Sequence, residues 1–363
     1  MSESLALVHD YLTQRGGAER VVASWAEAFP RAPIYTSLFD PSTTFSEFDP
    51  SRVNTSWLNT LAPLRHRHRL AFGVLAPTMS RWHIDADVVL ASSSGWAHGV
   101  RTNGRLVVYC HAPARWLYQT ERYLRARSFG SRAHLATKIL NPALTRWDQR
   151  AAHRADLYVA NSTYTAQLIE DIYGLQAVVL APPVNSPPAN LDVPVGCDVV
   201  VVARLLPYKN IDLVLDVAML SPELTFRVVG DGPLRRQLEQ RATANVTFVG
   251  PVTDEQLWRE YAGARLHLAV SHEDFGITPL EAAGAGRATV ARRSGGYLDT
   301  ITEATGVLVD EDHVTADSVR DAVVEALRRS WDARTLYEHA ARFSPQIHVA
   351  KLKELLFPPL TTE

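Results

Sequence analysis

A stretch rich in carboxylates and glycine, SHEDFGITPLEAAGAG at residues 271–286, contains the side chains best suited to binding chemistry. Seven residues separate Glu273 from Glu281, and they include Gly276, Thr278 and a proline. Proline favours the first turn of a helix, where free backbone N–H groups and the positive dipole end attract phosphate. A glutamate there repels phosphate but accepts hydrogen bonds from sugar or ribose hydroxyls. One alternative stays open, in which Glu273 lies in a solvated loop and Glu281 complements the helix dipole.

Two cations follow an apolar run in the stretch ARLLPYKNIDLVLDVA. Arg204 comes directly after the run, and Lys209 lies five residues later, where a helical pattern begins. Arginine offers phosphate oxygens a planar fork and lysine a compact charge, so the pair suits a diphosphate. The alternative left open is that both residues are surface charges flanking a turn.

Two loops in the first half of the chain also follow apolar runs. Gly16 and Gly17 precede a helical pattern, as in loops through which a backbone approaches phosphate. Glu19 fits the first turn of that helix, where the dipole favours a carboxylate. His111 and Arg115 follow the run LVVYC, at the end of a predicted strand. A catalytic and a structural role for His111 are equally open on this pattern.

The elements that must position these side chains alternate between apolar runs and helical patterns. Strands are predicted at residues 5–8, 87–91, 106–110, 156–160, 197–203, 226–230, 246–250, 266–270 and 288–291. Helices are predicted at residues 18–29, 162–174, 210–220, 234–242 and 254–263, the last with Asp254 as its N-cap. Continuous apolar strands alternating with helices predict buried parallel sheets. The predicted fold class is therefore α/β, with two Rossmann-like, doubly wound domains whose strand carboxyl ends face a central crevice.

Length and proline content divide the chain. Its 363 residues exceed a typical single core, and residues 181–194 hold five of the 21 prolines. Such a segment is typical of a stiff, extended linker. We predict one domain over residues 1–186 and a second over 187–344. A C-terminal helix is expected within 345–363, and the pattern does not indicate where it docks.

The overall composition is that of a soluble globular protein, with 46% apolar and 21% charged residues. No uncharged apolar run reaches 18 residues and no signal peptide precedes the first predicted strand, so we expect a cytoplasmic protein. The two cysteines, Cys110 and Cys197, lie in apolar runs. Their spacing fits neither a zinc site nor a disulfide framework, so both are expected to be buried thiols.

Charge is distributed unevenly between the two halves. Residues 1–186 carry 19 Lys and Arg against 14 Asp and Glu, a net charge of +5, and the remainder carries 18 against 25, a net charge of −7. Basic residues cluster at 63–75 and 121–138. Three explanations stay open: peripheral contact with the inner face of a membrane, binding of an anionic acceptor, or a solvated helix face. An acidic second half argues against a nucleic-acid partner.

Taken together, the motifs resemble those of the retaining GT-B glycosyltransferases of family 4, over nearly the whole chain. The most specific is the Glu-x(7)-Glu element, and it is joined in family order by the Gly-Gly loop, by RLLPYK and by the stretch from VVGDGPL to VTFVGPV. The elements HDYL, GGAERV and YCHAPARWLY resemble the branch that contains polysaccharide mannosyltransferases. That branch implies GDP-mannose as the donor.

The resemblance implies a role for each matching residue. Glu273 would bind hydroxyls of the donor sugar, Arg204 and Lys209 would take the leaving diphosphate, and His111 would touch the transferred sugar. Glu281 would hold the ribose. The residues expected around the donor are Gly16, Gly17, Gly230, Gly232, Gly250, Val252, Phe275, Gly276, Ile277, Thr278 and Glu281.

The expected activity is retaining transfer of a hexose, with mannose preferred, to a hydroxyl of a glycan, a lipid-linked or a small-molecule acceptor. No cofactor and no metal are expected. Other activities stay open: a UDP-sugar-dependent transferase of the same fold, a nucleotide-sugar epimerase, a sugar phosphorylase and a non-catalytic nucleotide-sugar-binding protein. An epimerase would act without an acceptor, and a binding protein would show no turnover.

Overall fold

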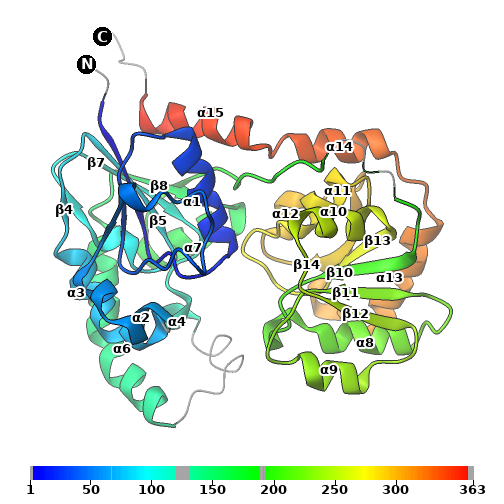
Figure 1. Ribbon diagram of the computed structural model, residues 1–363. Coiled ribbons are helices and arrows are strands. Elements are labelled where there is room, and N and C mark those ends of the chain that lie inside the picture. Colours follow the sequence, from blue (N-terminus) through cyan, green and yellow to red (C-terminus); the bar gives the residue numbers. More distant parts are fainter. Residues whose placement is uncertain (1–2, 67, 120–130, 189–190, 192, 359–363) are drawn as a thin grey trace. The chain divides into compact units, whose positions relative to one another are not determined.

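The computed structural model describes residues 3–66, 68–119, 131–188, 191 and 193–358. The chain forms two compact units, one made of Met1–Pro183 with Pro345–Glu363 and the other of Val184–Ser344 (Figure 1). The division falls three residues before the predicted boundary. Its cause is local, because the backbone N–H of Val184 donates to the carbonyl oxygen of Phe343 at 2.8 Å and ties the start of the linker to the second unit.

The first unit contains a seven-stranded parallel sheet with the order β3-β2-β1-β5-β7-β8-β9. The strands are β1 (Leu5–His9), β2 (Ile34–Thr36), β3 (Val53–Thr55), β5 (Val88–Ser93), β7 (Arg105–Cys110), β8 (Leu157–Ala160) and β9 (Ala177–Val179). A small parallel ribbon joins β4 (His83–Ile84) to β6 (Arg101–Thr102). The three-residue strands β2, β3 and β9 escape prediction because a run that short shows no pattern of its own.

Helices cover both faces of this sheet. They are α1 (Gly17–Ala28), α2 (Ala62–His66), α3 (Phe72–Ser80), α4 (Arg115–Tyr118), α6 (Ser131–Ala152), α7 (Thr163–Tyr173) and α15 (Pro345–Leu356), with 3-10 turns η1 (Pro50–Arg52), η2 (Trp57–Thr60), η3 (His68–Ala71) and η4 (Ala97–Gly99). Neighbouring residues of one strand face opposite sides, so Val89 and Leu90 of β5 belong to different cores.

The C-terminal helix α15 docks on the first unit, beside α1 (Figure 1). Leu352 and Leu356 are buried in the same core as Trp25, whose indole N–H donates to Nε2 of His348 at 2.9 Å. The guanidinium of Arg105 donates to the carbonyl oxygens of residues 355 and 356 at 2.7 and 3.0 Å, which caps the end of the helix. The helix therefore completes a core formed by the other end of the chain.

The second unit contains a six-stranded parallel sheet with the order β12-β11-β10-β13-β14-β15. Its strands are β10 (Cys197–Val202), β11 (Phe226–Val229), β12 (Val246–Gly250), β13 (Ala264–Ala269), β14 (Thr289–Arg293) and β15 (Gly306–Asp310). Numbered within each unit, the first six strands of both sheets follow the order 3-2-1-4-5-6 of a doubly wound fold, which confirms the predicted fold class. The order reverses between β1 and β5 in one unit and between β10 and β13 in the other.

The helices of the second unit are α8 (Ile211–Met219), α9 (Arg235–Arg241), α10 (Asp254–Ala262), α11 (Thr278–Gly284), α12 (Tyr297–Thr300), α13 (Ala316–Arg328) and α14 (Ala333–Ala341), with the 3-10 turns η5 (Pro207–Lys209) and η6 (Glu311–His313). Asp254 is not the N-cap of α10. Thr253 occupies that position and forms a reciprocal capping box with Gln256. The prediction is wrong by one residue because Asp is also favourable in the first turn.

Both cysteines are buried and unpaired, as predicted, at the end of β7 and the start of β10. Burial raises the pKa of Cys197 to about 11 and that of Cys110 further, so both remain thiols at neutral pH. Within the described ranges, no helix is long and apolar enough to cross a bilayer.

Candidate functional site

Lys209 and Glu273, predicted from separate motifs, meet where the strand order of the second unit reverses. The Lys209 ammonium donates to Oε1 of Glu273, and the Ser271 hydroxyl donates to the same oxygen at 2.6 Å. The side chains of the pair are 14% and 21% exposed. Asn210, in the left-handed region at φ 53°, links η5 to α8 and donates its amide to the carbonyl of Val270 at 3.3 Å. The two loops are thus fastened to each other.

Arg204 and Lys209 share a loop in which Tyr208 contacts both of them. The Arg204 guanidinium donates to the Tyr208 hydroxyl at 2.9 Å, and the Lys209 ammonium lies 5.2 Å from the centre of the Tyr208 ring. Arg204 is exposed, whereas Lys209 is held against Glu273. The loop therefore presents one ion-paired and one solvent-facing cation at the carboxyl end of β10.

The loop that carries Glu273 is packed so closely that only glycine fits at Gly276. Its φ is 84°, and a Cβ there would lie 2.5 Å from the ring of Tyr297. The N–H of Gly296 donates to the carbonyl oxygen of Glu273 at 2.9 Å, and Phe275 is buried. These contacts fix the backbone of the loop just before α11 begins at Thr278.

Glu281 lies in α11 and has a different partner from Glu273. Its Oε2 accepts a hydrogen bond from the hydroxyl of Tyr261 at 2.8 Å. Tyr261 is fully buried, and burial, reinforced by the charge of Glu281, raises the pKa of its hydroxyl well above the usual value. A buried donor therefore orients the Glu281 carboxylate in the first turn of α11, where the helix-dipole alternative also placed it.

The glycines after β11 lie against the loop after β10. At Gly230, with φ 124°, a Cβ would lie 2.1 Å from the carbonyl oxygen of Ala203. At Gly232 a Cβ would lie 2.5 Å from the carbonyl oxygen of Leu205. Side chains at either position would push the two loops apart.

The loop after β12 joins the same edge of the sheet. The N–H of Gly230 donates to the carbonyl oxygen of Gly250 at 2.9 Å. Gly250 has φ 88°, and a Cβ there would meet the guanidinium of Arg235 at 2.9 Å. Val252 is half-buried two residues further on. The structure thus brings Gly230 and Gly250, both expected around the donor, together at the carboxyl ends of β11 and β12.

In the first unit, the two predicted glycines differ in their surroundings. A Cβ at Gly16 would lie 2.4 Å from Oε2 of Glu19, whereas a Cβ at Gly17 would meet no atom within 4 Å. Glu19 lies in the first turn of α1, as predicted, where it is buried, and its Oε1 accepts from the amide of Gln14 at 2.8 Å. Packing within the unit therefore explains why residue 16 is a glycine, but it does not explain the glycine at position 17.

A chain of buried polar groups connects Glu19 to His111. Nε2 of His9 lies 3.7 Å from Oε1 of Glu19, and Nδ1 of His9 lies 2.9 Å from the hydroxyl of Ser92. The same hydroxyl lies 2.8 Å from Nε2 of His111. His9 ends β1 and Ser92 lies near the end of β5, so both belong to the point where the strand order reverses.

Burial and charge set opposite protonation states along this chain. Burial lowers the pKa of His9, but the hydrogen bond and charge of Glu19 outweigh it and leave that pKa above its usual value. The same contact holds the pKa of Glu19 below its usual value, against the effect of burial. Burial, helped by the charge of His9, lowers the pKa of His111 to about 3. At neutral pH His111 is therefore an uncharged imidazole.

Sequence reasoning did not identify His9 and Ser92. Two features of the sequence could have pointed to them. His9 and Asp10 come at the end of the first predicted strand, and three serines at residues 92–94 follow the predicted strand at 87–91. Asp10 of that pair is buried and accepts backbone N–H bonds from Ser94, Trp96 and Ala97 at 2.8, 3.1 and 2.6 Å. It holds the loop after β5 in place.

The two basic segments are described only in part. In the segment 63–75, Arg67 and the side chain of Arg69 lie outside the described residues, and Leu70 and Val74 are 62% and 38% exposed. Residues 121–130 of the second segment and the side chains of the rest also lie outside them.

Two family models match the chain, one in each half. Residues 15–186 match Glycosyltransferase Family 4, and residues 197–344 match Glycosyl transferases group 1. Among curated relatives, the D-inositol 3-phosphate glycosyltransferase of Rhodococcus erythropolis is 30% identical over 54% of this chain and 52% of its own. The O-antigen chain mannosyltransferase C of Escherichia coli is 33% identical over 34% of each chain. The chain thus spans about a third to a half of the length of these relatives.

Solved structures share the whole fold at low identity. Anabaena Alr3699/HepE, crystallised with UDP and glucose, is 19% identical with a TM-score of 0.70, over 98% of this chain and 99% of the other. Sucrose-phosphate synthase of Thermosynechococcus elongatus is 18% identical with a TM-score of 0.69, over 98% of both chains. At this level of identity the likenesses show that the chain shares the fold of these proteins.

Proposed function

Because the chain belongs to the family 4 glycosyltransferases of GT-B fold, we propose that it transfers a hexose from a nucleotide sugar to an acceptor hydroxyl with retention of anomeric configuration. The observation that carries the proposal is the pair Lys209 and Glu273 at the strand-order reversal of the second unit. Doubly wound folds bind their ligands at that point. A cation for phosphate and a carboxylate for sugar hydroxyls stand side by side there.

Donor binding exchanges the partners of this ion pair. The diphosphate accepts hydrogen bonds from the ammonium of Lys209 and the guanidinium of Arg204. Hydrogen bonds between charged groups are stronger than those that these cations make with water. Glu273, released from Lys209, accepts hydrogen bonds from hydroxyls of the sugar. Ser271 keeps the carboxylate in place throughout, through its bond of 2.6 Å. Charge on the leaving group is therefore stabilised by cations that the protein has already positioned.

Other residues fit the remaining parts of the donor. Glu281, oriented by Tyr261, accepts from the ribose hydroxyls. The backbone from Phe275 to Thr278 lines the diphosphate, and Gly230, Gly250 and Val252 border the base. These assignments rest on position at one edge of the sheet, together with the family motifs.

In the first unit, the open space at Gly17 admits a phosphate to the backbone. His111 contacts the transferred sugar as a neutral imidazole, so it adds no positive charge beside the electron-poor anomeric carbon. The chain of Glu19, His9 and Ser92 fixes the hydrogen bond that Nε2 of His111 makes. His9 and Ser92 are positioning residues on this proposal.

The chemical step breaks the bond from the anomeric carbon to the phosphate oxygen and forms the bond from that carbon to the acceptor oxygen on the same face. The acceptor proton passes to the leaving phosphate oxygen, so no side chain needs to act as nucleophile or acid. We propose no metal and no cofactor for this step.

GDP-mannose is the donor we favour. The motifs of the mannosyltransferase-like branch support it, as do relatives named as mannosyltransferases in Escherichia coli and Corynebacterium glutamicum. A UDP-sugar is the second candidate, because structural neighbours were crystallised with UDP. The acceptor is a glycan, a lipid-linked or a small molecule, and for a lipid-linked acceptor the exposed Leu70 and Val74 suit contact with the membrane surface.

Thermal unfolding with GDP, UDP, ADP and their sugar conjugates tests the proposal. A ligand present at a hundredfold excess over its Kd should add about 2.7 kcal/mol of stability. We expect the largest response to GDP and GDP-mannose, followed by transfer of labelled mannose in an acceptor screen. A preference for UDP would exclude GDP-mannose, and no response to any nucleotide would contradict the transferase proposal itself.

A further inference from the structure

Four arginines line a cavity of about 420 Å³ in the first unit, away from the loops discussed so far. Arg101 comes from β6, and Arg146, Arg150 and Arg154 come from the end of α6 and the turn after it. Arg101 precedes β7 and Arg154 precedes β8, so the cavity lies toward the amino ends of the strands. His111 and the Gly-Gly loop lie at the opposite, carboxyl edge of the same sheet.

The charges in this cavity are not balanced by acids. Arg146, Arg150 and Arg154 are spaced four residues apart, an arrangement that places like charges next to one another on a helix and is unfavourable. Among the described residues, none of the four arginines makes an ion pair. Arg154 instead donates to the carbonyl oxygen of Gly99 at 3.0 Å, and burial together with the charge of Arg101 lowers its pKa.

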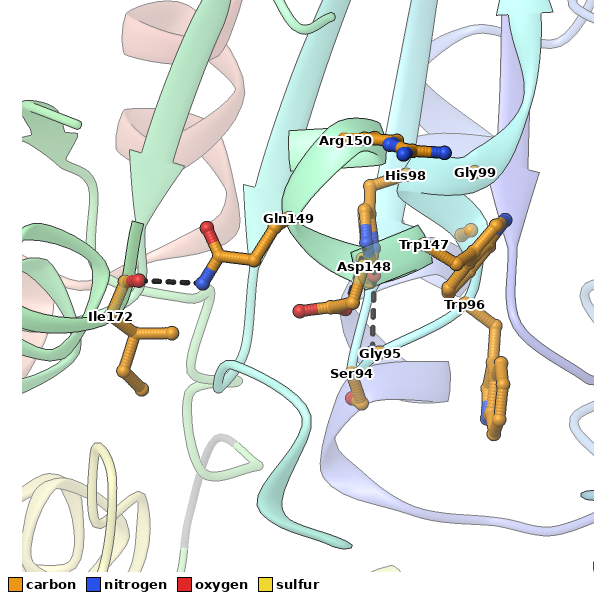
Figure 2. A network of polar contacts seen from close by, with 12 residues as sticks. Ser94, Gly95, Trp96, His98, Gly99, Trp147, Asp148, Gln149, Arg150 and Ile172 are labelled. Carbon is orange, nitrogen blue, oxygen red and sulfur yellow. Dashed lines mark hydrogen bonds and ion pairs between the residues drawn. The ribbon is translucent and has the colours of Figure 1, made fainter. Parts of the chain in front are cut away.

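The acids on the neighbouring stretch of chain are turned to other partners. Asp148 lies 3.1 Å from Nε2 of His98 and accepts from the hydroxyl of Tyr118 at 2.7 Å, as its position facing His98 in Figure 2 illustrates. Asp156 accepts from the backbone N–H of Leu106 at 2.7 Å. Neither carboxylate is available to neutralise the cavity.

One wall of the cavity is fixed by Trp147. Its indole N–H donates to the hydroxyl of Ser80 at 2.7 Å, which ties α6 to the end of α3. Its ring lies against Gly99, where a Cβ would be only 2.4 Å away, and beside His98 (Figure 2). The arginines on either side of Trp147 along α6 therefore project from a backbone that is held in place before any ligand arrives.

We propose that this cavity is a second anion site, which binds a phosphate-bearing group such as a phosphomonoester or a diphosphate. Guanidinium groups form paired hydrogen bonds with phosphate oxygens, and several converging on one cavity suit a group with more than one negative charge. The site is distinct from the proposed donor site, since none of the residues that line the cavity is among those assigned to the donor.

Two sources could supply such a phosphate: a lipid headgroup or a soluble phosphorylated compound. Leu140, on the preceding turns of α6, is 40% exposed and its side chain lies near Gly73 of α3, where a Cβ would be 3.9 Å from it. Apolar surface next to the arginines would suit the acyl region of a lipid. The phosphate chemistry is the same in both cases.

The first experiment measures binding of inorganic pyrophosphate by calorimetry in the full chain carrying Arg204→Ala and Lys209→Ala. These changes remove the donor-site cations, so a failure of the proposed function leaves this test unaffected. We expect pyrophosphate to bind, and affinity to fall at least tenfold when Arg146→Ala and Arg150→Ala are added. Arg150→Lys, which keeps the charge but not the fork, should cause a smaller loss.

The matched control is the pair Arg31→Ala and Arg236→Ala, which removes the same charge from exposed positions elsewhere. Circular dichroism melts check that every variant is folded. If the control lowers affinity as much as the cavity variant does, or if pyrophosphate does not bind and the vesicles described next do not either, the proposal is wrong.

Vesicles identify the source. Phosphatidylcholine vesicles with and without phosphatidic acid are sedimented with the unsubstituted chain and with Arg146→Ala/Arg150→Ala. Binding that needs both phosphatidic acid and the two arginines supports a headgroup site. Pyrophosphate binding that needs the arginines, without such vesicle binding, supports a soluble phosphorylated ligand. Vesicle binding that survives loss of the arginines, with no arginine-dependent pyrophosphate binding, contradicts the site.

Discussion

At the scale of single residues, the contact between Lys209 and Glu273 predicts that substitutions of the two residues change diphosphate affinity in different ways. Lys209→Ala should lower affinity for the nucleoside diphosphate by about 10- to 100-fold, as expected for loss of a charged hydrogen bond of about 1.5–3 kcal/mol. Glu273→Gln removes a carboxylate that competes for Lys209, so diphosphate affinity should hold or rise. Transfer should nevertheless fall about 100-fold or more, because the sugar hydroxyls then meet an uncharged amide in place of a carboxylate.

Calorimetry with the diphosphate and an initial-rate assay separate the two effects. Glu255→Gln, at an exposed ion pair with Arg259, serves as the control for loss of a carboxylate. A similar drop in diphosphate affinity for Lys209→Ala and Glu273→Gln would mean that the two residues do not divide the donor between them.

The buried pair of His9 and Glu19 predicts a pH-dependent contribution to stability. The raised pKa of His9 means that its contribution is complete below pH 6.5 and is lost as pH rises through the folded-state value. The lowered pKa of Glu19 means that its contribution is present above pH 4.5 and is lost on acidification. The pair therefore stabilises the fold most between about pH 4.5 and 6.5.

Glu19→Gln should consequently destabilise the chain by about 3 kcal/mol near pH 6, the scale of breaking a buried pair, and by less at pH 9. Urea unfolding at a series of pH values measures the difference between the two proteins. A difference that stays constant from pH 6 to pH 9 would show that His9 does not change its charge in this range.

At the scale of elements, Gly16 and Gly17 at the start of α1 separate folding from binding. A Cβ at Gly17 meets no protein atom, so Gly17→Ala should leave the free energy of unfolding within about 0.5 kcal/mol, as at ordinary surface sites. If a donor phosphate approaches the backbone there, donor affinity should still fall about tenfold.

Gly196→Ala is the matched control, since a Cβ there also meets nothing within 4 Å. Thermal melts give the stability of both variants and titration with the preferred nucleotide sugar gives the affinity. Equal affinities for Gly17→Ala and Gly196→Ala would remove Gly17 from the donor site.

How far the sequence predicts these elements depends on length and burial. The runs that became β5, β7, β10 and β13 are predicted because a central strand is covered on both faces, so most of its residues are apolar. β15, with the sequence GVLVD, is missed because its apolar run is only three residues long and lies between Gly306 and the exposed Asp310. The residues of the second-unit site follow recognisable motifs. His9 and Ser92, which connect Glu19 to His111, follow no such motif, because they lie in separate strands, β1 and β5, that only the folded sheet brings together.

At the scale of the molecule, the docking of α15 makes the first unit depend on the end of the chain. Leu352→Ala and Leu356→Ala remove fully buried side chains, and each should destabilise that unit by about 2–5 kcal/mol. Hydrogen exchange should rise in β1 and β5 while β10 and β13 stay protected. Met219→Ala, at an exposed apolar position, is the control. Increased exchange in both units would mean that they unfold together.

The route of the chain has a consequence for modularity. The first unit is built from both ends of the sequence, with the second unit as one continuous segment between Pro183 and Pro345. In genetic terms the second unit is an insertion within the first. A chimera that exchanges residues 184–344 for the matching segment of a relative would therefore keep both parts of the first unit, including α15 and the surface on which it docks. The residues proposed to border the nucleotide base all lie in the exchanged segment, so preference for the base should follow the cassette while the unit that carries His111 and the arginine cavity stays unchanged.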